Sequence, residues 1–164
     1  MPEFDIVINV GSDDTDLAKL AINCVQQFSG VATIHVISSK KRLEYFSSFP
    51  RVELHDENTI VPGVTLQKIT EYLKKKGFET DCFGWYFQQI LKMGWACRKE
   101  SSEYYLIWDA DLIPLRKIDF FNNKNLVKLQ MIYLPQEDMR AYTRLTSLQP
   151  VYRNSLISEH MMIK

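Results

Sequence analysis

The stretch at residues 5–38 reads DIVINVGSDDTDLAKLAINCVQQFSGVATIHVIS, and it contains two short apolar runs separated by an amphipathic segment. The runs at residues 5–10 and 33–38 have the length and the β-branched content of buried strands. Between them, apolar residues recur at spacings of three and four, which is typical of one face of a helix. These residues are Leu17, Leu20, Ala21, Cys24, Val25 and Phe28. A strand, a helix and a strand of these lengths predict a βαβ unit and therefore a parallel sheet.

The rest of the chain continues the alternation of strands and helices. We predict further strands at residues 52–55 and 104–108, and helices at residues 41–47, 66–76 and 84–98. The pattern is weaker beyond Pro114, where we expect a strand at 127–133, a polar helix at 137–145 and a last run at 155–163. The predicted fold class is α/β, with a mainly parallel, Rossmann-like sheet and helices on both faces.

Composition and charge narrow the class of protein. The 164 residues suit a single domain with one core. The 20 basic residues balance the 20 acidic ones, so no excess of positive charge indicates a nucleic-acid or anionic-membrane partner. None of the three cysteines forms a CxxC pair, which argues against disulfides and a structural zinc site. Without a signal peptide or a transmembrane segment in the sequence, we expect a cytoplasmic protein, and the oligomeric state stays open.

The segment YYLIWDADLIPL at residues 104–115 carries the clearest chemical pattern. An almost continuously apolar run, as expected for a central parallel strand, ends in Asp109 and Asp111. In an extended chain residues i and i+2 point the same way, so both carboxylates should project from the carboxyl end of the strand. Open α/β sheets bind ligands at that edge, and paired carboxylates suit Mg²⁺ or Mn²⁺. Such a metal would neutralise a diphosphate leaving group.

Two other interpretations of this segment remain. The aspartates can simply end a strand and begin a turn, because DxD alone is a weak motif. Phosphatases of the haloacid dehalogenase type also place a nucleophilic aspartate after an apolar strand, but normally after the first strand of the chain. Here Asp109 lies far along the chain, and Leu112-Ile113 replaces the small residues of that motif. The phosphatase is therefore the weaker alternative.

The predicted helix at residues 84–98 has two distinct faces. An apolar stripe, with a glycine that would allow close packing on the sheet, consists of Phe87, Ile90, Leu91 and Gly94. The second stripe, here called the Trp85 stripe, consists of Trp85, Gln88, Gln89 and Lys92. An aromatic plane, two amides and a cation can stack on a ring, bind hydroxyls and pair with phosphate. A solvated helix face with a tryptophan anchor explains the pattern almost as well.

Together these segments resemble a family of bacterial glycosyltransferase-like proteins associated with capsule and lipopolysaccharide genes. A GWYxQQxLK helix precedes a DxD strand in that family, and this chain has GWYFQQILK at residues 84–92 and DAD at residues 109–111. The pair Asp56-Glu57 is similar to an acidic pair of the family. Residues 155–162 (SLISEHMM) resemble a later motif centred on a histidine, here His160. The resemblance spans nearly the whole chain, and GWYxQQxLK is far more specific than DxD.

The resemblance implies a GT-A-type nucleotide-diphospho-sugar transferase fold and a division of roles. The Trp85 stripe would face the sugar or the diphosphate of the donor. Asp109 and Asp111 would bind Mn²⁺ or Mg²⁺, and His160 would join the metal shell or lie beside it. The loop at residues 9–13 and one acidic residue would lie near the base and ribose; the candidates are Asn9, Val10, Gly11 and Asp56.

The predicted function is transfer of a sugar from a nucleotide-diphospho-sugar to a surface glycan or a lipid-linked glycan. The enzyme would work in the cytoplasm, with peripheral association to the inner face of the membrane left open. Enzymes of this kind usually continue past the histidine motif, so we expect the 164 residues to form one GT-A-like domain, the donor half, with the acceptor half missing. The alternative is a non-catalytic nucleotide-sugar-binding module or an inactive fragment.

Two further histidines have no evident role in the sequence. His35 lies in the middle of a predicted strand, and His55 lies at the end of another. Because neither has a metal-ligand partner at a suitable spacing, we expect both to be structural or surface residues.

Overall fold

The computed structural model describes residues 3–11, 15–78, 82–98, 102–125 and 160–163. The chain divides into two compact units, Met1–Asp119 with His160–Lys164 and Phe120–Glu159. The first unit contains all the helices and strands of the described residues, and the fold below is the fold of that unit. The predicted strand at 127–133 and the predicted helix at 137–145 lie outside the described residues.

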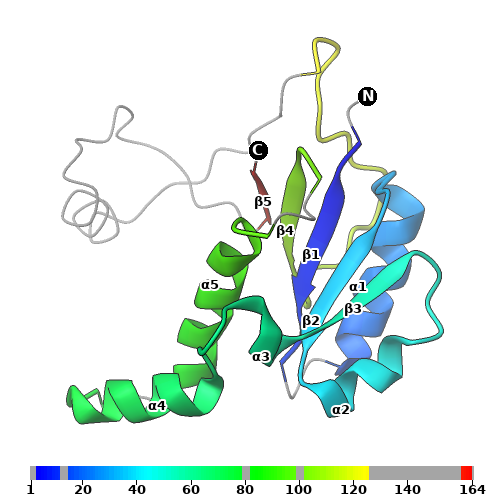
Figure 1. Ribbon diagram of the computed structural model, residues 1–164. Helices are drawn as coiled ribbons and strands as arrows, with labels where there is room; N and C mark the ends of the chain where they lie inside the picture. The colour runs from blue at the N-terminus through cyan, green and yellow to red at the C-terminus, as the bar shows by residue number, and fades with distance from the viewer. Residues whose placement is uncertain (1–2, 12–14, 79–81, 99–101, 126–159, 164) are drawn as a thin grey trace. The chain divides into compact units, whose positions relative to one another are not determined.

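The elements follow the predicted order (Figure 1). The strands are β1 (Asp5–Asn9), β2 (Ile34–Ser38), β3 (Val52–Asp56), β4 (Tyr105–Asp109) and β5 (His160–Ile163). The helices are α1 (Thr15–Phe28), α2 (Lys40–Leu43), the 3-10 turn η1 (Glu44–Phe46), α3 (Glu57–Ile60), α4 (Leu66–Lys75) and α5 (Phe83–Trp95). The predicted helix at 41–47 is therefore split into α2 and η1.

The strands form one sheet with the order β3-β2-β1-β4-β5. Strands β3, β2, β1 and β4 are parallel, whereas β5 pairs antiparallel with β4. The register sets Asn9 opposite Asp109, so the carboxyl ends of β1 and β4 lie side by side. This confirms the predicted α/β class with a mainly parallel sheet.

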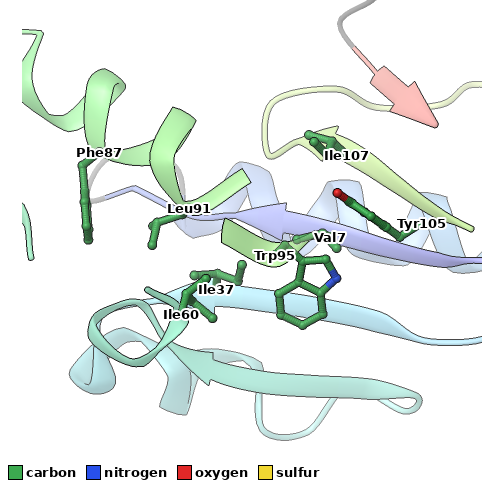
Figure 2. Close-up of a cluster of buried hydrophobic side chains, with 8 residues drawn as sticks. All are labelled: Val7, Ile37, Ile60, Phe87, Leu91, Trp95, Tyr105 and Ile107. Carbon is green, nitrogen blue, oxygen red and sulfur yellow. The ribbon is translucent and has the colours of Figure 1, made fainter. Parts of the chain in front are cut away.

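Helices cover both faces of the sheet, as predicted (Figure 1). On one face α5 packs its buried residues Phe87, Leu91 and Trp95 over the strands. Figure 2 shows these side chains with the strand residues of the same cluster, which are Val7, Ile37, Tyr105 and Ile107. Successive strand residues point to opposite faces, so Ile6 and Ile8, both fully buried, face α1 on the other side.

The buried face of α1 is rotated relative to the predicted one. Its buried residues are Ala18, Ala21, Ile22 and Val25, whereas Leu17 and Leu20 are exposed. The face centred on Ala18 and Ile22 therefore packs inward in place of the face that carries the two leucines.

Gly94 of α5 allows a close approach, but not to the sheet as predicted. A β-carbon at this position would overlap Cγ2 of Val61, which follows α3, and would lie 3.5 Å from Cγ2 of Ile60. Gly94 therefore lets α5 pack against Ile60 at the end of α3 and Val61 just after it, and Ile60 belongs to the cluster in Figure 2.

Among the described residues, no helix is both long enough and apolar enough to cross a membrane.

Candidate functional site

A pocket of about 440 Å³ opens where β1 and β2 end and α5 begins. This volume is in the range of small-molecule sites, and the position is the ligand-binding edge of an open α/β sheet. Its walls come from the ends of β1 and β2, from α2, and from the first half of α5. The lining residues are Asn9, Val10, Gly11, Ile37, Ser39, Arg42, Glu57, Leu66, Gly84, Trp85, Phe87, Gln88 and Leu91. Five residues predicted from the sequence therefore share one pocket: Asn9, Val10, Gly11, Trp85 and Gln88.

Asn9 fixes α5 to the end of β1. Its amide Nδ2 donates a hydrogen bond of 3.1 Å to the backbone oxygen of Gln88. Its Oδ1 is buried and makes no hydrogen bond within the part of the chain that the structure describes. A buried acceptor without a donor costs about 1–3 kcal/mol, so this oxygen favours a ligand that brings a hydroxyl or an N–H.

Lys92 and Asp109 form an ion pair across the end of β4. Lys92 Nζ donates to Asp109 Oδ1 at 2.6 Å, and the two side chains are 15% and 37% exposed. Lys92 lies two turns along α5 from Trp85, so the same helix contributes both to the pocket wall and to the carboxylate motif. The pair sets a cation beside Asp109 at the carboxyl end of β4.

The carboxylate motif is a turn rather than a continued strand. Asp109 is the last residue of β4, and Leu112 donates its backbone N–H to the Asp109 oxygen at 3.1 Å. The indole Nε1 of Trp108 donates to the backbone oxygen of Leu112 at 2.9 Å and holds this turn closed. The extended geometry expected for residues 109–111 is therefore wrong, because the chain turns at Ala110. Asp111 is exposed in the turn.

The acidic pair after β3 divides into a capping residue and a pocket residue. Asp56 Oδ1 accepts hydrogen bonds from the backbone and side-chain nitrogens of Asn58 at 2.9 and 3.0 Å, and so caps α3. Glu57, not Asp56, lines the pocket. Burial raises the pKa of Glu57, the guanidinium of Arg42 opposes that rise, and the Asp56 carboxylate adds to it.

Arg42 is a pocket residue that the sequence did not reveal. Its Nη1 donates to Ser38 Oγ at 3.1 Å, and Ser38 in turn donates to the Val10 oxygen at 2.8 Å. A neighbouring hollow of about 480 Å³ shares Arg42 and Ser39 and adds Thr15, Asp16, Lys19, Lys41 and Tyr45. A cation two residues into a short helix gives no periodic signal, so only the fold shows that Arg42 faces the ends of β1 and β2.

The remaining predicted residues differ in their positions. Trp85 is 57% exposed and packs edge-on against Tyr86 at 5.1 Å. Gln89 is half-buried and lies outside the residues that line the pocket. His160 begins β5, and the register sets its backbone opposite Trp108, next to Asp109. The side chain of His160 lies outside the described residues.

The two histidines without a predicted partner come together. His35 Nδ1 lies 3.1 Å from His55 Nε2, and the Glu53 carboxylate lies beside both rings. Neither histidine has a partner at a metal-ligand spacing in the sequence, but the pairing of β2 with β3 brings the two rings and Glu53 together. The cluster lies outside the pocket described above.

Comparison with solved structures defines the class of fold. The mannosyltransferase Ktr4p from S. cerevisiae superposes with a TM-score of 0.54 at 11% identity, over 89% of this chain and 45% of that one. Mouse xyloside xylosyltransferase 1, apo form, gives a TM-score of 0.45 at 10% identity, over 71% of this chain and 45% of that one. The fold is the Rossmann-like GT-A fold, and the chain spans less than half the length of both structures.

Residues 10–145 match a family described as a family of unknown function, DUF6492, and the chain belongs to this family. No curated protein matches the chain.

Proposed function

We propose that this chain binds a nucleotide-diphospho-sugar in the pocket at the ends of β1 and β2 and acts in transfer of the sugar. The observation that carries this proposal is the grouping of Asn9, Val10, Gly11, Trp85 and Gln88 around one pocket of about 440 Å³. The sheet edge, the GT-A fold and the GWYxQQxLK resemblance all support the same ligand class.

The pocket offers separate groups for the parts of such a donor. Asn9 Oδ1 would accept a hydrogen bond from the base or ribose, and the exposed Trp85 ring would stack on a planar or sugar ring. Arg42 is the cation of the pocket wall and would pair with a phosphate. Lys92 lies beyond Gln88 on α5 and would meet the diphosphate beside Asp109.

The motif at the end of β4 has the donor chemistry for Mn²⁺ or Mg²⁺. Asp109 and Asp111 offer hard carboxylate oxygens, and such ions take only one or two carboxylates, with waters and phosphates completing the shell. When bound, the metal would neutralise charge on the diphosphate leaving group. Lys92 already holds one oxygen of Asp109 at 2.6 Å, so lysine and metal would share or compete for this carboxylate. His160 is proposed as a third ligand on the sequence resemblance alone, because residues 155–162 resemble the later histidine motif of the family.

The acceptor side of the proposal rests on the sequence resemblance alone. The resemblance indicates that the acceptor is a surface glycan or a lipid-linked glycan. The enzyme would be cytoplasmic and would bind this acceptor at the inner face of the membrane. The second candidate is a nucleotide-sugar-binding module without turnover, which would use the same pocket.

A thermal-shift screen with nucleoside diphosphates and nucleotide sugars, each with and without Mn²⁺, tests the proposal. A ligand that binds only the folded state raises the melting temperature, and we expect the largest rise when nucleotide and Mn²⁺ are present together. Asp109→Asn should remove the additional rise, whereas Asp119→Asn, an exposed carboxylate outside the pocket, should not. Release of nucleoside diphosphate from the best donor then separates the enzyme from the binding module. A screen in which no nucleotide raises the melting temperature would contradict both.

A further inference from the structure

A cluster of two histidines and a glutamate lies across strands β2 and β3. The register pairs His35 with Glu53 and Ile37 with His55, so all three side chains share the face that Ile37 presents to α5. Their potential ligand atoms all lie within 4.8 Å of one another. In the described part of the chain, this is the one group of three such residues that meets that condition.

The three closest ligand atoms have the spacing of a metal shell. His35 Nδ1 lies 3.1 Å from His55 Nε2 and 3.4 Å from Glu53 Oε2, and His55 Nε2 lies 3.9 Å from the same oxygen. Ligands bound tetrahedrally at about 2.0–2.1 Å from zinc are about 3.3 Å apart. The observed separations bracket that value, so an ion needs little rearrangement to reach all three atoms.

A buried carboxylate behind His35 completes the arrangement. Asp5, at the start of β1, has Oδ2 at 3.4 Å from His35 Nε2, and Ser102 Oγ donates to the same oxygen. A histidine that ligates a metal through one nitrogen typically directs its other N–H to a carboxylate, which orients the ring. The Asp5 carboxylate lies on the Nε2 side of the His35 ring, opposite the Nδ1 atom that faces His55 and Glu53, although Nε2 makes no hydrogen bond among the described residues.

The cluster has a buried side, formed by the two histidines, and a solvent-exposed side, formed by Glu53. The side chains of His35 and His55 are 7% and 15% exposed, and the Trp95 ring lies 4.7 and 4.9 Å from the two imidazoles. Figure 2 shows Trp95 at the end of α5, beside the sheet. Glu53 is 62% exposed and lies on the edge strand β3, so an ion can enter from solvent at that edge.

We propose that His35, His55 and Glu53 form a zinc site that fastens the edge strand β3 to the sheet. Two imidazoles and one carboxylate are a ligand set of zinc, with a fourth position for water, whereas Mg²⁺ prefers oxygen ligands alone. The site is distinct from the Asp109–Asp111 motif. His35 is paired with Val7 in the middle of the strands, while the motif follows the carboxyl end of β4. The inference therefore stands apart from the proposed function.

The site has a structural consequence for the pocket. Strand β3 is only half-buried along most of its length, and it leads directly into α3 and Glu57 of the pocket wall. A metal that bridges β2 and β3 would hold this edge strand, and a ligand that binds the folded state stabilises it.

Zinc titration of the full chain, freed of any purification tag and of bound metal, tests the site. We expect one Zn²⁺ per chain by calorimetry and elemental analysis. Glu53→Gln should weaken zinc binding at least tenfold, and His55→Ala should remove it. Asp111→Asn, which alters the other carboxylate motif, should bind zinc like the parent.

Glu53→Gln should fold normally because Glu53 is exposed. The zinc affinity of this variant therefore still tests the site if His55→Ala does not fold. Cobalt substitution adds a spectroscopic measurement, because tetrahedral Co²⁺ with nitrogen ligands absorbs strongly in the visible range, and this band should weaken in Glu53→Gln. Equal zinc affinity in parent, Glu53→Gln and His55→Ala would overturn the proposal. Absence of zinc binding by the parent would also overturn the proposal and would leave the cluster as a hydrogen-bonded ion-pair network. Loss of zinc binding in Asp111→Asn alone would overturn it as well.

Discussion

The geometry of the ion pair between Lys92 and Asp109 predicts how strongly the two charges contribute to the stability of the fold. Two unit charges 2.6 Å apart attract by about 1.6 kcal/mol in bulk water and about 6 kcal/mol at an effective dielectric constant of 20. Exposed pairs contribute a net 0–1 kcal/mol, whereas breaking a buried pair costs about 3–5 kcal/mol. With exposures of 15% and 37%, this pair lies between the two cases, and we expect a coupling energy of about 1–2 kcal/mol.

A double-mutant cycle measures this coupling directly. Lys92→Met removes the charge and keeps the apolar stem, Asp109→Ala removes the carboxylate, and the double variant closes the cycle. Unfolding in urea, in buffer free of divalent metal, gives the four free energies of unfolding. For a chain of this size each kcal/mol should also lower the melting temperature by about 2–4 °C.

The outcome decides whether the pair is formed in solution. A coupling energy below about 0.3 kcal/mol, with both single variants close to the parent, would show that Lys92 does not hold Asp109 and would refute the reasoning. A second measurement uses the same variants, because Lys92→Met leaves Asp109 without its competitor. Mn²⁺ should then bind more tightly to Lys92→Met than to the parent, while the nucleoside diphosphate should bind more weakly.

Three further predictions concern the packing and the pocket. Gly94→Ala should destabilise the fold by about 1–3 kcal/mol in thermal unfolding, because the added β-carbon would overlap Val61. Gly84→Ala is the control and should be neutral or slightly stabilising, because no atom lies within 4 Å of the added β-carbon. Burial raises the pKa of Glu57 in the folded state, so the folded state loses free energy relative to the unfolded state at any pH where this carboxyl is ionised. Glu57→Gln should therefore raise the free energy of unfolding at pH 7, and this gain should disappear below the ordinary pKa of 4.5. An equal gain at pH 7 and below pH 4.5 would contradict the prediction. Trp85→Ala should weaken nucleotide-sugar binding several-fold in calorimetry. The melting temperature should not change, because Trp85 is 57% exposed. A large loss of stability would instead assign Trp85 to the core.

The sequence predicted the parallel sheet because its strands are short, apolar and regularly spaced. Residues 5–10, 33–38 and 104–108 became β1, β2 and β4 within one residue at each end. The helix faces were harder to predict. Periodicity predicted that the leucines of α1 are buried, but the helix turns the face with Ala18 and Ile22 inward and leaves Leu17 and Leu20 exposed.

Five of the residues that line the pocket could be predicted from the sequence, but the contacts of the site could not. Lys92 and Asp109 were both named, yet their ion pair depends on how α5 crosses the end of β4, which no local pattern encodes. Arg42 needed the same three-dimensional information. The cluster of His35, Glu53 and His55 was missed because its members are separated in sequence and meet only through the register of β2 with β3.

The most direct test of the central claim is calorimetric titration of a nucleoside diphosphate into the chain, with and without Mn²⁺. The account predicts that Mn²⁺ tightens binding about tenfold or more in the parent. Asp111→Asn should lose this metal dependence and keep the fold, while Glu53→Gln should retain it. Equal affinity with and without Mn²⁺ in the parent, or no binding under either condition, would contradict a nucleotide-sugar site at the ends of β1 and β2 that a metal at the end of β4 assists.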